Sequence, residues 1–203
     1  MLSHHDLATL AAAAYTEPGS DIAALAVKGD LLPRDGELVV AAPGTDPTNA
    51  LDLIRDARAL PSWIPGLGMM HSGFGKGGAA LWAKIDRLMR REGLITYVGH
   101  SLGGALAEVL AAHHAIHRPR QPFRVIVFGC PRLAWLNPYF RRLLRSGLEH
   151  IEYRNAGDPV TFVPIRAMGY LHGADGRTLG AARPDPLANH AVELYVERIA
   201  SGD

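Results

Sequence analysis

A serine flanked by glycines, Gly99-His-Ser101-Leu-Gly103, carries the clearest chemical signature in the chain. A serine on a very sharp strand-to-helix turn has a strained backbone, so the residues two before and two after it must have almost no side chain. An apolar run precedes this motif, and an Ala- and Leu-rich segment follows it. A helix N-terminus there supplies N–H groups and partial positive charge. The pattern predicts a nucleophilic Ser101 rather than an incidental serine in a glycine-rich turn.

A nucleophilic serine needs a base, and the base needs an orienting carboxylate. Asp158 is the favoured acid, because it lies in a turn directly after the short strand-like run 150–155. Asp175 and Asp185 are alternatives. Each lies in a turn or proline-flanked sequence where aspartate is expected without any catalytic role.

Two histidines downstream of Asp158 are candidates for the base. His190 lies where a Pro-rich loop leads into the last helical segment, which suits an imidazole that must reach a serine. His172 follows an apolar Tyr-Leu pair and is more simply explained as a structural histidine. The residues favour His190 but leave His172 open, because geometry rather than chain order decides which imidazole reaches the serine.

The rest of the chain alternates short apolar runs with longer segments of helical composition. Runs bounded by Gly, Pro or Asn predict buried strands at 37–42, 94–99, 124–129 and 150–155. We expect an opening helix that ends at Tyr15, with Ser3 or Asp6 as its N-cap. The later helices are predicted at 48–60, 77–91, 101–117, 138–146 and 188–200, and an antiparallel edge strand at 24–32. This alternation favours a mostly parallel α/β sheet.

Composition limits the class of protein. The 203 residues are 48% hydrophobic and 20% charged, so we expect residues 1–203 to form one domain around one core. A net charge of +1 argues against nucleic acid as a partner. No run approaches a membrane span and no signal peptide is recognised. We therefore expect a cytoplasmic protein, and export without a cleaved signal stays open.

The sequence indicates no metal site. The single cysteine cannot form an intramolecular disulfide, and no Cys/His cluster has the spacing of metal ligands. His113, His114 and His117 lie close together, but we interpret them as a solvated helix end rather than as a metal site. No cofactor is expected.

Five segments, in order, resemble the class 3 lipases, the fungal-type lipase family of α/β hydrolases. They are Val39–Thr45, His71-Ser-Gly-Phe74, Gly99–Gly104, Phe128-Gly-Cys-Pro-Arg132, and Asn155–Val160 with Pro164. The resemblance extends from about Leu38 to the C-terminus. It implies a single-domain α/β-hydrolase fold, in which helices flank both faces of a mostly parallel central sheet. It also implies a lipase or esterase that works through a covalent acyl-enzyme without a metal or a cofactor.

The resemblance implies particular site residues. It gives Ser101, Asp158 and His190 as the catalytic triad and places His172 at a position that is not catalytic in the family. The backbone N–H groups of Thr45 and Leu102 are the implied oxyanion donors.

The chain departs from the family pattern at two places. Pro43 replaces the usual arginine before Gly44, and Asn189 stands where aspartate is common. The first departure bears on how the oxyanion segment is braced, for which Asp56 and, less favoured, Asp52 are candidates.

The substrate class implied by the resemblance is an acyl ester or a lipid. Residues 60–70 form the most apolar loop-like stretch, and four of its side chains could wall an acyl-chain site, belong to a lid or touch a lipid interface transiently: Trp63, Ile64, Leu67 and Met69. An equal alternative is that they pack against the core beside Phe74. Two other functions stay open, a catalytically silent binding module with this fold and an acyltransferase.

Overall fold

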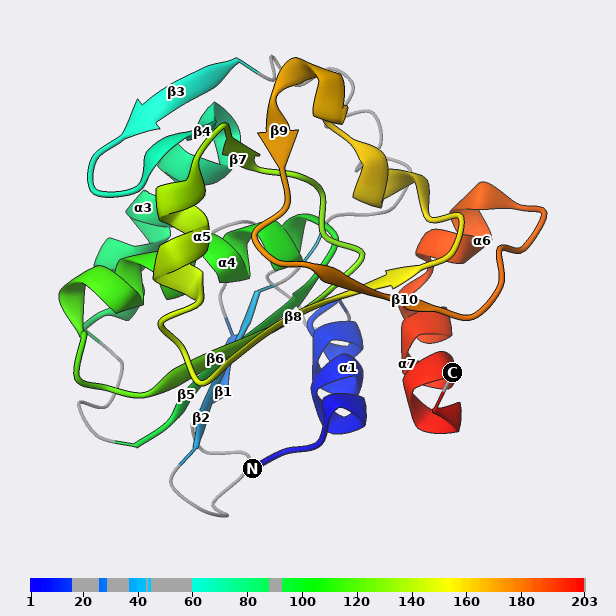
Figure 1. The fold of residues 1–203 in the computed structure, drawn as a ribbon. Coiled ribbons are helices and arrows are strands. Elements are labelled where there is room, and N and C mark those ends of the chain that lie inside the picture. The colour runs from blue at the N-terminus through cyan, green and yellow to red at the C-terminus, as the bar shows by residue number, and fades with distance from the viewer. Residues whose placement is uncertain (16–25, 29–36, 43, 45–59, 88–92, 203) are drawn as a thin grey trace.

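A six-stranded sheet forms the centre of the molecule (Figure 1). The computed structural model describes residues 1–15, 26–28, 37–42, 44, 60–87 and 93–202. The strands of this sheet are, in spatial order, β1 (Ala26–Lys28), β2 (Leu38–Ala42), β5 (Ile95–His100), β6 (Phe123–Phe128), β8 (Glu149–Asn155) and β10 (Gly176–Leu179). β1 pairs antiparallel with β2, and all the other neighbours are parallel. The predicted mostly parallel sheet is confirmed.

The central strands are buried along their whole length. Every residue of β2, β5 and β6 is buried, because helices cover both faces of a parallel sheet. Because both faces of these strands are buried, their sequences are mostly apolar, and the strands could be predicted from those runs. β10 was not predicted, since its Gly-Arg-Thr-Leu sequence is mostly exposed and lacks that signal.

Helices lie on both sides of the sheet (Figure 1). One face packs on α3 (Ser72–Ile85), α4 (Leu102–His117) and α5 (Pro138–Leu144), and the other on α1 (His4–Ala13) and α7 (Val192–Ser201). Side chains alternate between the two cores along each strand, as the pleat of a strand requires. On β5, for example, Tyr97 belongs to the first core and Val98 to the second.

The N-terminal helix is held by its cap and by a buried ion pair. The Ser3 side chain accepts from the Asp6 amide, and the Asp6 side chain accepts from the Ser3 amide, which completes a capping box. Arg124 Nη2 lies 2.7 Å from Glu37 Oε1 and donates to the Leu2 carbonyl oxygen. The Leu2 amide donates in turn to Glu37 Oε2 at 3.0 Å. Each charge of this pair therefore has a partner.

A second, four-stranded antiparallel sheet comprises β3 (Pro61–Ile64), β4 (Gly68–His71), β7 (Ala134–Trp135) and β9 (Tyr170–Leu171). The prediction that residues 60–70 form a loop is therefore wrong, because they form the β3–β4 hairpin. Gly66 in its turn and Gly68 at the start of β4 both have positive φ, and the Leu67 amide donates to the Ile64 carbonyl oxygen at 3.0 Å.

The predicted helix bounds differ most from the structure at α3 and at the last helix. α3 begins at Ser72 rather than at residue 77, and residues 88–92 lie outside the described part of the chain. The last predicted helix is two helices, α6 (Pro186–His190) and α7, separated at Ala191 by an extended ψ of 131°. The Pro186 start is capped by the Asp185 side chain. The predicted helix at 48–60 lies almost wholly outside the described residues.

The histidines near the end of α4 are not a solvated group. His113 and His114 are buried, and His114 bonds to the Tyr97 hydroxyl at 2.9 Å and to the Gln121 carbonyl oxygen at 3.1 Å. His117 is the exposed member. The Ala-rich helix packs closely enough on β5 and α3 to bury even its last turns. Within the described ranges, no helix is long and apolar enough to cross a bilayer.

Candidate active site

Ser101 lies at the sharp turn between β5 and α4. Its φ of 57° and ψ of −128° are strained values that a serine rarely adopts. The turn is tight enough that a Cβ added to Gly99 would lie 2.4 Å from the carbonyl oxygen of Gly103. The Ser101 amide is anchored by donating to the Phe128 carbonyl oxygen at 2.9 Å. The strained conformation predicted for this serine is confirmed.

Ser101, His190 and Asp158 form a linear hydrogen-bonded cluster. Ser101 Oγ lies 2.9 Å from His190 Nε2, and His190 Nδ1 lies 2.9 Å from Asp158 Oδ2. All three residues are 0% exposed. Because a carboxylate only accepts, Nδ1 carries the proton and Nε2 offers its lone pair to the serine hydroxyl. This arrangement can remove the serine proton and hold the resulting imidazolium beside a carboxylate.

Asp158 is oriented by donors from three directions. It follows β8 and caps the short 3₁₀ turn Pro159–Phe162 by accepting from the Val160 amide at 2.9 Å. The buried Tyr195 hydroxyl donates to Asp158 Oδ2 at 2.5 Å, and His190 supplies the third donor. Burial, and then the Asp158 carboxylate, raises the pKa of Tyr195 well above its usual value. The phenol therefore stays a donor. The sequence offered no signal for this role, because Tyr195 has the pattern of a core residue on α7.

The break between α6 and α7 lies directly after His190, where the backbone carbonyl of His190 accepts a hydrogen bond. The extended ψ at Ala191 accompanies a hydrogen bond from His100 Nε2 to the His190 carbonyl oxygen at 2.9 Å. His100 Nδ1 then accepts from the Tyr15 hydroxyl at 2.7 Å. Burial, with His190 adding to it, keeps the pKa of His100 well below its ordinary value. His100 is therefore neutral and fixes the His190 backbone through this hydrogen bond. In the sequence it was visible only as part of the serine motif.

Comparison with known proteins identifies the family. The family model described as Lipase (class 3) matches residues 39–168. The chain belongs to the class 3 lipase family.

Among the relatives is a secreted mono- and diacylglycerol lipase of Malassezia globosa, 33% identical over 88 residues. That match covers 42% of this chain but only 28% of the relative. The structure of a mono- and diacylglycerol lipase from Aspergillus oryzae superposes with a TM-score of 0.67 at 21% identity, covering 91% of this chain and 82% of that one. The structure of a triacylglycerol lipase whose catalytic centre is a serine protease triad gives a TM-score of 0.56 at 21% identity. The match covers 71% of this chain and 58% of that one. These structures show the α/β-hydrolase fold.

One glycine of the family-like Phe-Gly-x-Pro-Arg segment lies against the cluster. Gly129 follows β6 with a φ of +57°. A Cβ at this position would lie 2.9 Å from Asp158 Oδ2, 3.1 Å from the Tyr195 hydroxyl and 3.2 Å from His190 Cε1. Any side chain there would push the acid and the imidazole apart, so glycine is required by both conformation and space.

The two implied oxyanion donors differ in what the structure describes. Leu102 is the first residue of α4, where backbone N–H groups have no acceptor within the helix. Thr45 lies outside the described residues, as do Pro43, Asp52 and Asp56. Gly44 is described, and a Cβ on it would lie 2.8 Å from the His100 carbonyl oxygen. The residue before Thr45 therefore lies beside the serine turn.

The alternative acids and base lie elsewhere. Asp175 is exposed and pairs with Arg141 and Arg145, and Asp185 caps α6 through the Leu187 amide. His172 Nε2 donates to the Thr161 carbonyl oxygen at 2.9 Å, and its Nδ1 lies 2.8 Å from Glu152 Oε2. The lipase fold brings none of these three to Ser101.

The four predicted acyl-site or lid residues divide into two pairs. Ile64 and Leu67 are buried in the core cluster that also holds Phe74. Trp63 is 68% exposed, and with Met69 it lines an open surface cavity of about 250 Å³. Trp135, Leu136 and Tyr139 line the same cavity. The first pair packs as the alternative interpretation expected, and the acyl-site role stays a prediction.

Proposed function

We propose that this class 3 lipase hydrolyses carboxylic esters of lipids through a covalent acyl-enzyme on Ser101. The observation that carries the proposal is the 2.9 Å contact between Ser101 Oγ and His190 Nε2, in a buried cluster completed by Asp158. Distances in this range allow direct proton transfer from the hydroxyl to the imidazole. Family membership supports lipase chemistry in general, whereas the roles of the individual residues belong to the proposal.

In the first half-reaction, Ser101 Oγ attacks the ester carbonyl carbon while His190 Nε2 takes the hydroxyl proton. Asp158 keeps Nδ1 protonated and stabilises the imidazolium. The tetrahedral intermediate collapses with cleavage of the bond to the alcohol oxygen, which leaves with the proton from His190. Water then attacks the acyl-serine by the same route, giving the carboxylic acid and the free serine.

The oxyanion is proposed to accept hydrogen bonds from the backbone N–H groups of Leu102 and Thr45. The N-terminus of α4 supports the first donor, and the position of Gly44 beside the His100 carbonyl supports the second. One donor of this kind contributes about 3–4 kcal/mol to transition-state stabilisation in other hydrolases.

Partial glycerides are the substrate class that we propose. Two relatives are named as mono- and diacylglycerol lipases, one of them across most of this chain's fold. The exposed Trp63, Leu136 and Tyr139 gather around one cavity and offer an apolar surface to a lipid interface. We propose that this surface makes transient contact with lipid.

The test compares wild type with Ser101→Ala on p-nitrophenyl esters from acetate to palmitate and on a monoacylglycerol. We expect wild type to turn over, and the variant to lose about three or more orders of magnitude in kcat. A fluorophosphonate that labels wild type and not the variant measures the same nucleophile independently of substrate choice. Inactivity on every ester without labelling would favour the silent binding module. Transfer of the acyl group to added alcohol in preference to water would indicate an acyltransferase.

A further inference from the structure

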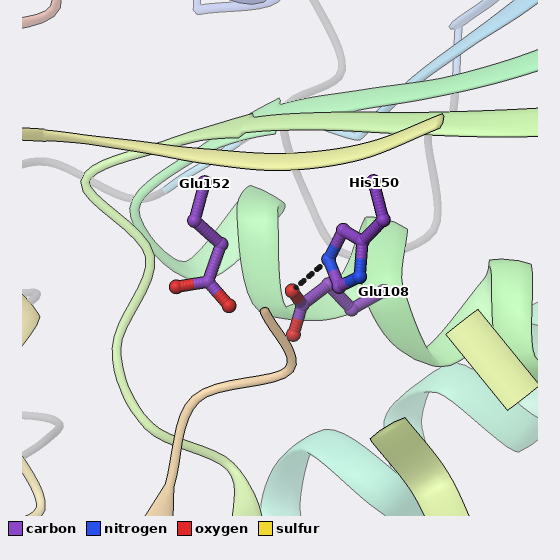
Figure 2. Close-up of side chains that lie close together, drawn as sticks. All are labelled: Glu108, His150 and Glu152. Carbon is purple, nitrogen blue, oxygen red and sulfur yellow. Dashed lines mark hydrogen bonds and ion pairs between the residues drawn. The ribbon is translucent and has the colours of Figure 1, made fainter. Parts of the chain in front are cut away.

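A second buried cluster of polar side chains lies between α4 and β8 (Figure 2). Glu108 comes from the middle of α4, and His150 and Glu152 from alternate positions of β8. Alternate residues of a strand share one face. Figure 2 shows the two carboxylates and the imidazole converging on one another. One ligand atom from each residue lies within 4.8 Å of the others.

The three side chains are removed from solvent. Glu108 and Glu152 are 0% exposed, and the His150 side chain is 4% exposed. The loop after β9 covers them closely, because a Cβ on Gly173 would lie 2.5 Å from Glu108 Oε1. A buried carboxylate is costly unless donors or a cation compensate for its lost hydration.

Glu152 has such compensation. Its Oε1 accepts from the Ala174 amide at 2.8 Å, and its Oε2 accepts from Arg154 Nη2 at 2.5 Å. His172 Nδ1 lies 2.8 Å from Oε2 but makes no hydrogen bond to it. These contacts fix the carboxylate in one orientation. A carboxylate has about four lone-pair sites, so Oε1 still has one to offer.

Glu108 lacks equivalent compensation. Its Oε1 lies 2.7 Å from His150 Nε2, whereas its Oε2 has no hydrogen-bond partner among the described residues. His150 Nδ1 is likewise without a partner in the described part of the chain. Burial and the neighbouring Glu152 raise the pKa of Glu108 well above its usual value, so this acid takes up a proton unless a cation compensates for its charge. A fully buried acid with one imidazole contact and an unpaired oxygen near a second acid is therefore an environment that a positive ion would stabilise.

We propose that Glu108, His150 and Glu152 bind a divalent first-row metal ion, with Zn²⁺ as the type case. One imidazole nitrogen and two carboxylate oxygens are ligands that Zn²⁺ accepts. Mg²⁺ and Ca²⁺ prefer oxygen ligands alone and in larger number. Arg154 and His172 orient the Glu152 ligand from outside, as partners of metal ligands commonly do.

An ion at this position would join the two elements that carry the proposed chemistry. α4 begins at the Ser101 turn, and β8 leads directly to Asp158. The site is therefore expected to stabilise the fold rather than to take part in ester cleavage. Its test needs no ester substrate, so it can fail or succeed independently of the proposed function.

The experiment uses the untagged protein after removal of metals with a chelator. Zn²⁺ is titrated by calorimetry, and the unfolding midpoint is followed in Zn²⁺, in Mg²⁺ and in chelator. We expect one equivalent of Zn²⁺ to bind. Zn²⁺ at about 100 times its Kd should raise the midpoint by roughly 5 °C or more, and Mg²⁺ should leave it unchanged. X-ray absorption should show nitrogen or oxygen ligands at about 2.0–2.1 Å and no sulfur.

Glu108→Gln retains the side chain's shape and removes its charge, so it should abolish the bound equivalent and the shift in midpoint. His150→Gln serves the same purpose if Glu108→Gln does not fold. The matched control is His117→Gln, because His113 and His117 are stacked one helical turn apart and are the obvious competing metal site. The control should bind as wild type does. Absence of binding to wild type, a sulfur ligand, or loss of binding in His117→Gln but not in Glu108→Gln would overturn the proposal.

Discussion

Among the described residues, two buried clusters that pair a carboxylate with an imidazole can be compared: α4 supplies Glu108 to one and begins directly after Ser101 of the other. In the proposed catalytic cluster, Asp158 accepts from His190, from the Tyr195 hydroxyl and from a backbone amide. In the other, Glu108 contacts His150 and has an unpaired oxygen among the described residues. Burial alone therefore does not define the role of an acid. A carboxylate surrounded by donors is fixed to orient a base, whereas one with too few donors is suited to binding a cation.

The largest effect on activity is expected when Asp158, the fully paired acid, loses its charge. We expect Asp158→Asn to lower kcat about 10⁴-fold, because an amide no longer holds His190 with its proton on Nδ1. The pH–rate profile and kcat on a soluble ester measure the effect. Asp175→Asn is the control, since Asp175 is an exposed partner of Arg141 and Arg145. Equal loss in both variants would contradict the assignment of Asp158.

A smaller effect on activity is expected when Asp158 is kept and one of its donors, the Tyr195 hydroxyl, is removed. Tyr195→Phe should lower kcat roughly 10-fold with little change in KM, because hydrogen bonds to charged groups contribute about 1.5–3 kcal/mol. Tyr97→Phe is a matched control that removes a buried tyrosine–histidine hydrogen bond on the other side of the sheet. We expect both variants to lose similar stability, with a drop in kcat for Tyr195→Phe alone. A purely structural Tyr195 would leave the kcat values of the two variants equal.

Loss of charge should have little effect on stability at Glu108, the acid with too few donors, as long as no metal is bound. In chelator, Glu108→Gln should be as stable as wild type to within about 1 kcal/mol, since replacement of a poorly compensated buried charge is often neutral or stabilising. In Zn²⁺ at about 100 times its Kd, wild type should become more stable than the variant by roughly 2–3 kcal/mol. Denaturant unfolding in the two buffers measures both values. A variant that is much less stable in chelator would indicate that Glu108 is already fully compensated without a metal.

The smallest effect is expected outside both clusters. Trp63→Ser removes an exposed ring and should change stability by less than about 0.5 kcal/mol. It should lower the ratio of activity on lipid vesicles to activity on a soluble ester by several-fold, because an exposed tryptophan suits a lipid–water interface. Vesicle sedimentation checks the binding directly. An unchanged ratio would remove Trp63 from the proposed lipid contact.

Local patterns in the sequence determined the serine turn and the strands of the central sheet other than β10. Continuous apolar runs revealed β2, β5 and β6, because strands buried on both faces lack alternating polar residues. β8 was predicted from a more alternating run that ends at Asn155. The turn at Ser101 was equally readable, since its backbone excludes side chains at the flanking glycines. The order of Asp158 and His190 in the chain, together with the family resemblance, named the other two residues that the structure brings to Ser101. Their catalytic roles stay predictions.

Tertiary structure alone decided how these residues are held. Tyr195, His100 and the break at Ala191 acquire their roles from partners far away in the chain, and each has an ordinary core or helix sequence. Glu108 lies more than forty residues from His150, with which it makes a contact. Backbone propensity and hydrophobic periodicity act over a few residues, whereas the pairing of a buried charge depends on which strands and helices meet. The sequence therefore determined the serine turn and much of its scaffold, and only the fold decided which buried acids are satisfied.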